Sequence, residues 1–234
     1  MIDMELMTGG TLGDLLDNSQ LQPALLLPYS VQMVKGLSFL HGVGIIHRDI
    51  TPRNILISSS NCLELADFGL SHLMSGIEPR TPLVCSLYYR APELLRVNAF
   101  VKDTRSLAYT YAIDNWSVGC ILREMIIGQG PVFKPARPTF SPTTSAIEQL
   151  DAIIRKFCPS SGFVNEKLAM NFCASSLKLP ETAVPSQAPA WVIQMLEVTR
   201  LLLVPDPELR CTAEAACKIL EQLETTQCNK LPRM

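Results

Sequence analysis

The sequence predicts a mainly helical α+β domain that carries one small β hairpin. Apolar residues recur with helical period across residues 26–40, which predicts an amphipathic helix. Residues 112–127 are apolar on nearly every side, and a helix with that pattern is buried all round. Residues 55–57 and 63–66 are short apolar runs joined by a turn of Ser and Asn, so we expect them to pair as strands.

Shorter patterns indicate the other elements. Thr11 can cap a short helix that ends near Asn18, with Asp14 as its capping-box partner. We further expect a strand over residues 1–7, an exposed insertion over 96–105 and a loop over 131–142. Helices are expected over 147–154, 191–203 and 212–223, with a mostly irregular stretch over 158–189 and fraying of the last ten residues.

Composition limits the class of protein. The chain of 234 residues suffices for one large domain or two small ones, and its 47% of hydrophobic residues can fill a sizeable core. A formal net charge of −2 provides no basic field for nucleic acid. The eight cysteines form no CxxC pair, as expected of reduced thiols in a cytoplasmic or nuclear protein. We also expect no signal peptide and no membrane helix, because the N-terminus lacks a basic region and no apolar run approaches ~18 residues.

Four short motifs follow one another in a meaningful order. They are HRDITPRN at 47–54, ADFG at 66–69, APE at 91–93 and DNWSVG at 114–119. One such tripeptide is a weak signal, whereas an ordered set with compatible spacing is a strong one. In this order they resemble the catalytic loop, the metal-binding loop, the activation-segment anchor and the central helix of a eukaryotic protein kinase. The resemblance implies the helical C-terminal lobe of that fold, with the hairpin beside the catalytic loop.

The resemblance implies chemical roles for three side chains. Phosphoryl transfer asks mainly for positioning and for charge that offsets the phosphates. Asp49 would accept or orient the proton of the substrate hydroxyl. Asn54 and Asp67, brought together by the hairpin, would hold Mg²⁺, a hard cation that prefers oxygen ligands and bridges the ATP phosphates. Taken one at a time, these residues are best interpreted as a surface Asp and an Asn in unrelated turns. That interpretation is not favoured for the ordered set of motifs.

Four further residues match the nucleotide-binding positions of resembling kinases. Residues 1–7 correspond to the fifth strand and the hinge, so Met4 would be the gatekeeper and the backbone from Glu5 to Met7 would face the adenine edge. Leu56 matches the residue that packs under adenine. An ordinary strand and a core leucine remain the alternative interpretation of these positions.

Residues 81–93 resemble the activation segment of cyclin-dependent and glycogen-synthase kinases, in which Tyr-Arg precedes Ala-Pro-Glu. The match implies that Thr81 is the site of the activating phosphothreonine. Arg48 is the nearest cation that the motifs define, and pairing with it would order the segment. Ser86 falls where Ser/Thr kinases carry the hydroxyl that contacts the catalytic Asp.

Residues 205–213 resemble the Asp-Pro-x-x-Arg-x-Thr-Ala motif near the end of kinase domains. In that family the arginine pairs with the glutamate of Ala-Pro-Glu, which implies a pair between Arg210 and Glu93. A bidentate pair of this kind fixes geometry better than it adds stability. The resemblance also implies that Asp114 holds the backbone of the catalytic loop.

Two features depart from the family pattern. Thr51 stands where kinases place the lysine that neutralises the transferring phosphate. Arg53 stands where many tyrosine kinases carry a compensating arginine, and it is either that substitute or a solvated loop residue. The resemblance also begins at the fifth strand, so the chain corresponds to the C-lobe with the N-terminal β lobe missing. We assign residues 1–225 to the kinase domain and residues 226–234 to a frayed tail.

The sequence thus favours a serine/threonine protein kinase that uses ATP and Mg²⁺ on a protein substrate, at Ser or Thr followed by Pro. The partners expected from the resemblance are the substrate and a cyclin-like or other regulatory subunit, with no nucleic acid and no membrane. We expect weak or no phosphoryl transfer by the isolated chain, because the lobe that covers the ATP phosphates in the family is absent. The alternatives are a catalytically inactive kinase remnant that acts as a protein-binding module, and an unrelated helical interaction protein.

Overall fold

A computed structural model describes residues 6–74, 85–101, 110–135, 141–180 and 188–229 of the chain. Within these ranges the structure has the helices α1 (Leu12–Asp17), α2 (Leu26–Gly42), α3 (Pro92–Phe100), α4 (Ala112–Ile127), α5 (Pro142–Phe157), α6 (Glu166–Cys173), α7 (Ala190–Leu202) and α8 (Ala213–Cys228), and the strands β1 (Ile45–Ile46), β2 (Ile55–Ile57), β3 (Leu63–Leu65) and β4 (His72–Leu73). Short 3₁₀ turns occur at Pro23–Leu25, Pro52–Asn54, Phe68–Leu70 and Leu87–Tyr89.

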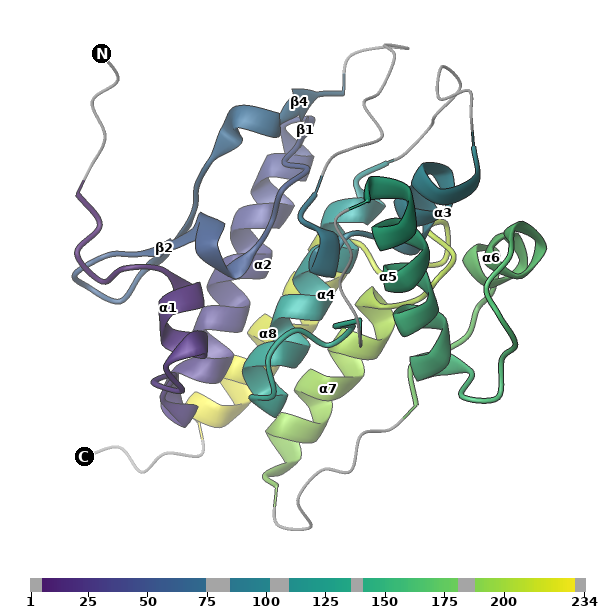
Figure 1. Ribbon diagram of the computed structural model, residues 1–234. Coiled ribbons are helices and arrows are strands. Elements are labelled where there is room, and N and C mark those ends of the chain that lie inside the picture. The colour runs from purple at the N-terminus through teal and green to yellow at the C-terminus, as the bar shows by residue number, and fades with distance from the viewer. Residues whose placement is uncertain (1–5, 75–84, 102–109, 136–140, 181–187, 230–234) are drawn as a thin grey trace.

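Helix α4 is the centre of the structure, and its predicted bounds are confirmed. Every residue from Ala112 to Met125 is buried. Figure 1 shows α4 among α2, α7 and α8, with α3, α5 and α6 gathered on one side. Gly119 lets α4 approach α7 closely, because a Cβ there would lie 2.9 Å from Cβ of Leu202. The core therefore consists largely of what packs around this one helix.

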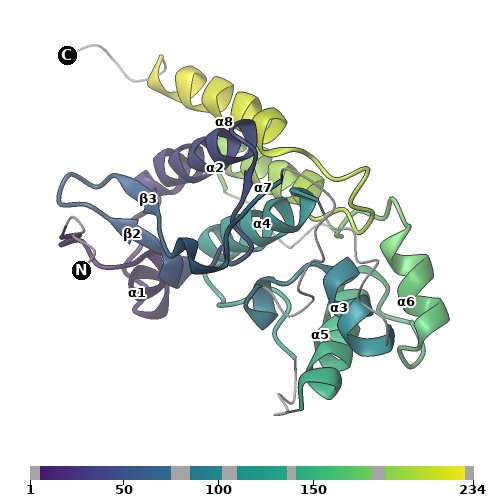
Figure 2. The same cartoon turned by 90° about the horizontal axis from the view of Figure 1, so that it is seen from above.

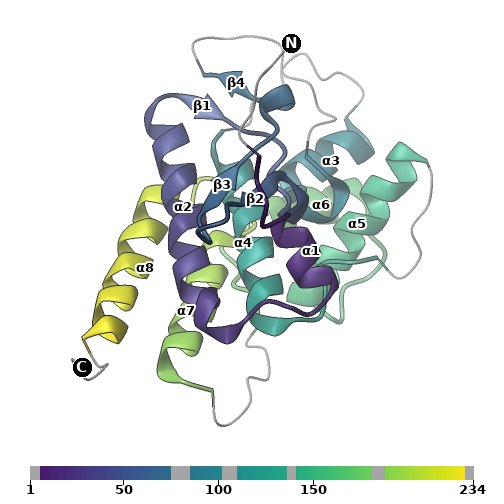
Figure 3. The ribbon, with the colours of Figure 1, turned by 90° about the vertical axis from the view of Figure 1, so that its left-hand side faces the viewer.

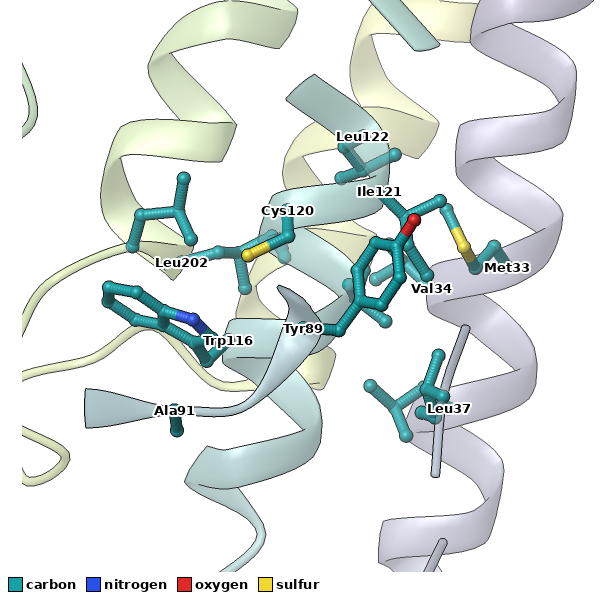
Figure 4. Packing of buried hydrophobic residues seen from close by; sticks show 14 of the residues in the cluster. Met33, Val34, Leu37, Tyr89, Ala91, Trp116, Cys120, Ile121, Leu122 and Leu202 are labelled. Atoms are coloured by element: carbon teal, nitrogen blue, oxygen red, sulfur yellow. The ribbon is translucent and has the colours of Figure 1, made fainter. Parts of the chain in front are cut away.

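The close packing around α4 joins it to two other helices. In Figure 4 the ring of Tyr89 lies between Ile121 of α4 and the side chains of Val34 and Leu37 on α2. Trp116 lies on the side of α4 that faces α7, and its ring stacks on Phe133 with the centroids 5.4 Å apart. These side chains pack α4 against α2 on one side and face α7 on the other.

The predicted hairpin is confirmed, and it occupies the N-terminal side of the molecule. Strands β2 and β3 pair antiparallel with Ile55 opposite Leu65. Figures 2 and 3 show the hairpin beside α1 and α2, with α8 alongside the length of α2. The first helix also begins as predicted, because Thr11 and Asp14 form a reciprocal capping box.

Several expectations about the weaker elements were wrong. Helix α3 continues to Phe100 and buries Val97, so the first part of the expected insertion at 96–105 is packed helix. Helix α6 was missed within the stretch 158–189 that we expected to be mostly irregular. The last helix runs to Cys228, so residues 226–228 of the expected tail are helical. Leu6 and Met7 are not in a strand, and the rest of the strand expected over 1–7 lies outside the described residues.

The two-residue pair β1–β4 was not predicted from sequence. Within the described part of the chain, no helix is both long and apolar enough to cross a membrane.

Candidate active site

The loop that carries HRDITPRN is fastened to the central helix by one buried carboxylate. Asp114 in the first turn of α4 is fully buried. Its Oδ1 accepts the backbone N–H of Arg48 at 2.9 Å, and its Oδ2 accepts the backbone N–H of His47 at 2.8 Å. Nε2 of His41 lies 3.0 Å from the same Oδ2. The expected grip of Asp114 on the loop backbone is confirmed, and it holds Arg48 in a left-handed conformation with φ 68°.

His47 links this loop to the residues before Asp67. Its ring is fully buried, with Nε2 3.0 Å from the carbonyl oxygen of Ala66. The backbone N–H of Asp49 lies 3.3 Å from its Nδ1. These partners assign the proton to Nε2, because a carbonyl can only accept and an N–H can only donate. The sequence motif contained this histidine, but its bridging contact was not anticipated.

Asp49 is held by two other predicted site residues. Its Oδ1 accepts hydrogen bonds from the backbone N–H and the hydroxyl of Ser86, at 2.9 and 3.0 Å. The side-chain amide of Asn54 donates to Oδ2 of Asp49 at 3.1 Å and to its backbone carbonyl at 2.9 Å. The structure thus brings Asp49, Asn54 and Ser86 together, in contacts that span 37 positions of sequence.

Asn54 and Asp67 lie at the same end of the hairpin. Asn54 immediately precedes β2, and its carbonyl accepts the N–H of Ala66, the residue before Asp67, at 2.8 Å. Asp67 adopts a left-handed conformation with φ 61°, and the N–H of Gly69 donates to its Oδ1 at 3.3 Å. The adjacency that the hairpin implied is therefore present.

Both side chains suit a hard cation such as Mg²⁺. The amide nitrogen of Asn54 donates to Asp49, so its oxygen points away from that contact and accepts no hydrogen bond from the described residues. Asp67 is exposed. Mg²⁺ typically takes one or two carboxylates plus substrate phosphates, and no cluster of three or more His, Cys, Asp or Glu occurs in the described ranges.

The segment after Met7 lies beside the strand that carries Leu56. The N–H of Gly9 donates to the carbonyl of Ile57 at 2.9 Å, and the N–H of Ile57 donates to Gly10 at 3.0 Å. Gly9 is required at this approach, because a Cβ there would lie 2.7 Å from the carbonyl oxygen of Ile57. Two of the expected nucleotide contacts, Met4 and Glu5, lie outside the described residues.

Residues 85–90 form a bent segment that carries Ser86 to Asp49. Cys85 is left-handed, with φ 64°, and its carbonyl accepts two hydrogen bonds from Arg90, from Nε at 3.2 Å and from Nη2 at 2.8 Å. Burial raises the pKa of the Cys85 thiol well above its ordinary value. Thr81, the expected phosphorylation site, lies outside the described residues. The left-handed Cys85 was not anticipated, and no local sequence signal such as glycine marks it.

The end of this segment is anchored in the core by two further contacts. The hydroxyl of Tyr89 donates to Oε2 of Glu124 at 2.9 Å, and Ser117 donates to the carbonyl of Tyr89 at 2.8 Å. Burial and the Glu124 carboxylate raise the pKa of Tyr89. The predicted pair of Arg210 and Glu93 is confirmed as a bidentate contact at 2.8 and 3.0 Å.

Arg53 and Thr51 occupy the positions that bear on the missing lysine. Arg53 is exposed, and its guanidinium contacts Asp17 and, at 3.8 Å, Asp14, both on α1. Thr51 is only 7% exposed. The structure thus shows the guanidinium of Arg53, which the sequence left open as a substitute for the lysine or a solvated loop residue, in contact with helix α1.

The hairpin, the tethered loop and the anchored segment together define the C-terminal lobe of a protein kinase. The protein kinase domain model matches residues 1–220, and the chain belongs to the protein kinase family. The mainly helical α+β fold class that the sequence predicted is confirmed.

Two curated relatives agree with the subgroup that the motifs indicated. The chain is 39% identical to "Protein kinase gsk3" of Schizosaccharomyces pombe over 128 residues, which cover 54% of this chain and 29% of that protein. It is 35% identical to "Cyclin-dependent kinase 10" of Bos taurus over 190 residues, which cover 78% of this chain and 47% of that protein. The chain thus spans less than half the length of either relative.

A solved structure shares the fold. It is the crystal structure of the yeast RNA Pol II CTD kinase CTDK-1 complex, with a TM-score of 0.64 and 24% identity. The match covers 96% of this chain and 69% of that one. The resemblance to the cyclin-dependent and glycogen-synthase kinase group is therefore confirmed.

Proposed function

We propose that this chain is the C-lobe portion of a serine/threonine protein kinase that transfers the γ-phosphoryl group of ATP to a protein hydroxyl. The observation that carries the proposal is the fixed carboxylate of Asp49, which Asn54 holds through Oδ2 and Ser86 holds through Oδ1. A carboxylate held on both sides can orient the proton of an acceptor hydroxyl without reorganising.

The remaining residues would serve the nucleotide. Bound ATP with Mg²⁺ supplies the phosphoryl group and the charge that offsets it. The oxygens of Asn54 and Asp67 would hold the metal, while Leu56 and the backbone near Met7 would meet the base. The side chain of Arg48 is already engaged, because its Nε donates to the carbonyl of Leu70. A phosphate on Thr81 would therefore either pair with the other N–H groups of Arg48 or replace the carbonyl of Leu70 as the partner of its Nε.

Substrates with proline after the acceptor are the second part of the proposal. This part rests on the resemblance of residues 84–90 to the same segment of proline-directed kinases. Here the carbonyl of Cys85 is turned by its left-handed backbone and already receives two hydrogen bonds from Arg90. A substrate N–H facing that carbonyl would find no free acceptor, and proline is the residue that has no N–H to satisfy.

We also propose a cytoplasmic or nuclear location and a cyclin-like or other regulatory subunit. The eight cysteines are free thiols, which suits a reducing compartment. The regulatory subunit is supported by the name of the cyclin-dependent relative and by the solved structure of similar fold, which is that of a kinase complex.

A kinase remnant that acts as a protein-binding module is the second candidate function. The placement of Arg53 on α1 favours it, because neither Arg53 nor Thr51 then offers a cation to the transferring phosphate. Under either function we expect the 234-residue polypeptide alone to transfer phosphate poorly. Phosphates open to water lose the low-dielectric setting that makes electrostatic stabilisation strong.

The test separates the two candidates. MgATP affinity is measured by calorimetry, and phosphorylation of a generic protein substrate is measured with residues 1–234 alone and with a separately expressed kinase N-lobe. We expect transfer to Ser or Thr before Pro only when the lobe is added, and none with Asp49→Asn, which preserves size. The absence of transfer under both conditions would favour the binding module, and transfer by Asp49→Asn would remove the assigned role of Asp49.

A further inference from the structure

Two arginines of the core are equally buried but have very different partners. Arg210 is 4% exposed and Arg123 is 5% exposed. All five N–H groups of Arg210 donate, two of them to the carboxylate of Glu93 and three to backbone carbonyls. Within the described residues Arg123 donates one hydrogen bond, from Nη1 to the hydroxyl of Thr199 at 3.3 Å. The charge of Arg123 therefore has no partner comparable to Glu93 among those residues.

Among the described residues, the surroundings of Arg123 supply no negative charge that is free to pair with it. Thr199 is neutral, and its hydroxyl donates to the carbonyl of Leu196 at 2.7 Å. Burial and the nearby charge of Arg200 lower the pKa of Arg123. Arg200 contacts Glu197 at 2.7 Å, so that carboxylate is already engaged. A guanidinium stays charged and is unfavourable when it is buried without a counter-charge. A bound anion would therefore stabilise Arg123.

A pocket beside Arg123 has room for an anion. Its volume is about 320 Å³, and its walls are the end of α4, residues 129–132, Lys156 in the last turn of α5, and residues 179–180. None of the described lining residues is acidic. Lys156 is exposed and forms no ion pair with any described carboxylate. Two cations from two helices thus face one cavity.

We propose that this cavity, the α4–α5 pocket, binds a phosphate group, with Arg123 and Lys156 as its two cations. The planar fork of Arg123 suits two phosphate oxygens, and the ammonium group of Lys156 adds a second, point-like charge. The volume is near the lower end of ligand pockets, which suits a phosphate or a phosphorylated side chain.

The pocket is separate from the candidate active site. Arg123 lies nine positions after Asp114 on the same helix, which corresponds to ~14 Å along its axis. Phosphate binding here does not depend on the proposed kinase activity, and its test does not use catalysis.

The test is a titration of isotope-labelled residues 1–234 with inorganic phosphate, followed by NMR at pH 7.5 with chloride keeping the ionic strength constant. We expect saturable shifts of the amide signals of Gly130, Val132 and Lys156. Lys156→Gln should weaken binding at least ~5-fold, somewhat less than the tenfold change that the loss of a ~1.4 kcal/mol interaction produces. Arg123→Met should abolish saturation, and if that variant does not fold, Lys156→Gln alone decides.

The matched control is Arg155→Gln, which removes the same charge one position earlier on α5. Arg155 contacts Asp151 at 2.6 Å and does not line the α4–α5 pocket, so the affinity of this variant for phosphate should stay within ~2-fold of the unmodified chain. Shifts that do not saturate, or equal weakening by both substitutions, would overturn the proposal because they indicate general screening.

A second titration identifies the source of the phosphate. A peptide with one phosphoserine is compared with its unphosphorylated form and with inorganic phosphate. Tighter binding of the phosphopeptide than of inorganic phosphate indicates a phosphorylated protein segment as the ligand. Equal or weaker binding of the phosphopeptide indicates a small phosphate compound, and binding of the unphosphorylated peptide with the same affinity as the phosphopeptide would contradict the proposal.

Discussion

Arg210 and Glu93 meet in a bidentate ion pair although 117 positions of sequence separate them. The guanidinium also lies 5.0 Å from the ring centroid of Trp116. The pair joins the first turn of α3 to the loop before α8, so it fixes the end of the segment that carries Ser86 against the last part of the fold.

Breaking this pair should destabilise the whole domain. Glu93→Gln leaves a buried guanidinium without its counter-charge, and we expect the free energy of unfolding to fall by ~3 kcal/mol. Urea unfolding followed by circular dichroism measures it. Glu214→Gln is the control, because Glu214 and Lys218 form an exposed pair at 2.6 Å and its unfolding midpoint should stay at the wild-type value. A Glu93→Gln midpoint equal to that of the control would contradict the structural role of the pair.

The close approach of Gly9 to β2 gives a second prediction. Gly9→Ala would place a Cβ 2.7 Å from the carbonyl oxygen of Ile57, and we expect a loss of ~1–3 kcal/mol in unfolding free energy. At Gly42, the last residue of α2, a Cβ would meet nothing within 4 Å, so Gly42→Ala should be neutral or slightly stabilising. Thermal unfolding compares the two, and equal melting temperatures would show that the Gly9 segment does not dock on β2.

Stability should fall at alkaline pH because burial raises the pKa of several thiols. Burial raises the pKa of Cys173 from 9.0 to about 12, with a further contribution from Glu93, and it raises the pKa of Cys120 well above the ordinary value. Above pH 9.0 the unfolded chain ionises first, so each such thiol lowers the unfolding free energy by ~1.4 kcal/mol per pH unit.

Urea unfolding between about pH 8 and pH 10.5 measures this slope. Cys173→Ala should reduce the slope by the contribution of one thiol, ~1.4 kcal/mol per pH unit. Cys62→Ala removes an exposed thiol and should leave the slope unchanged. A Cys173→Ala slope equal to that of the unmodified chain would show that this thiol ionises as easily folded as unfolded.

The contact between Tyr89 and Glu124 gives a prediction with a pH signature. Burial raises the pKa of Glu124, and the hydrogen bond from Tyr89 opposes that rise. Tyr89→Phe removes the donor, so the pKa of Glu124 rises further and the charged form in the folded state is less favourable. We expect a loss of ~1–3 kcal/mol at pH 7.5. The loss should be smaller at pH 5, because a raised pKa means that a larger fraction of the Glu124 carboxyl is protonated at the lower pH.

Chemical denaturation at both pH values checks the prediction. Tyr29→Phe is the matched control, because the hydroxyl of Tyr29 makes only a long 3.5 Å contact with Asn61. A Tyr89→Phe loss that is the same at pH 5 and pH 7.5 would contradict the prediction, because it would show that the protonation of Glu124 does not change over this range.

Strong patterns and ordered motifs made most of the fold and part of the site predictable. Helix α4 was placed because residues apolar on all sides have no stable exposed alternative. The pair of Arg210 and Glu93 followed from two motifs whose partners are fixed within the family. Helix α6 was missed although Asn165 caps it, because one short helix in a poorly periodic stretch gives little signal.

Other features depend on tertiary contacts that no local pattern encodes. The pair β1–β4 has two residues in each strand, which are too few to show the alternation of apolar and polar residues that indicates a strand. Arg53 matched a compensating position, but its direction is decided by Asp14 and Asp17, carboxylates some 36 positions earlier in the chain. The left-handed Cys85 results from its carbonyl being held by Arg90, which becomes visible only when the segment is folded.

Because Asp114 sits in the first turn of the buried helix α4, we expect the loop of residues 47–54 to open only when the core around α4 opens. Releasing the N–H groups of His47 and Arg48 would leave a fully buried carboxylate unsolvated. These two amides should therefore exchange with deuterium at the slow rate set by global unfolding, unlike ordinary loop amides, which exchange through local opening. The exchange rate of these loop amides would then match that of the core, although the loop lies between a helix and a hairpin in the sequence.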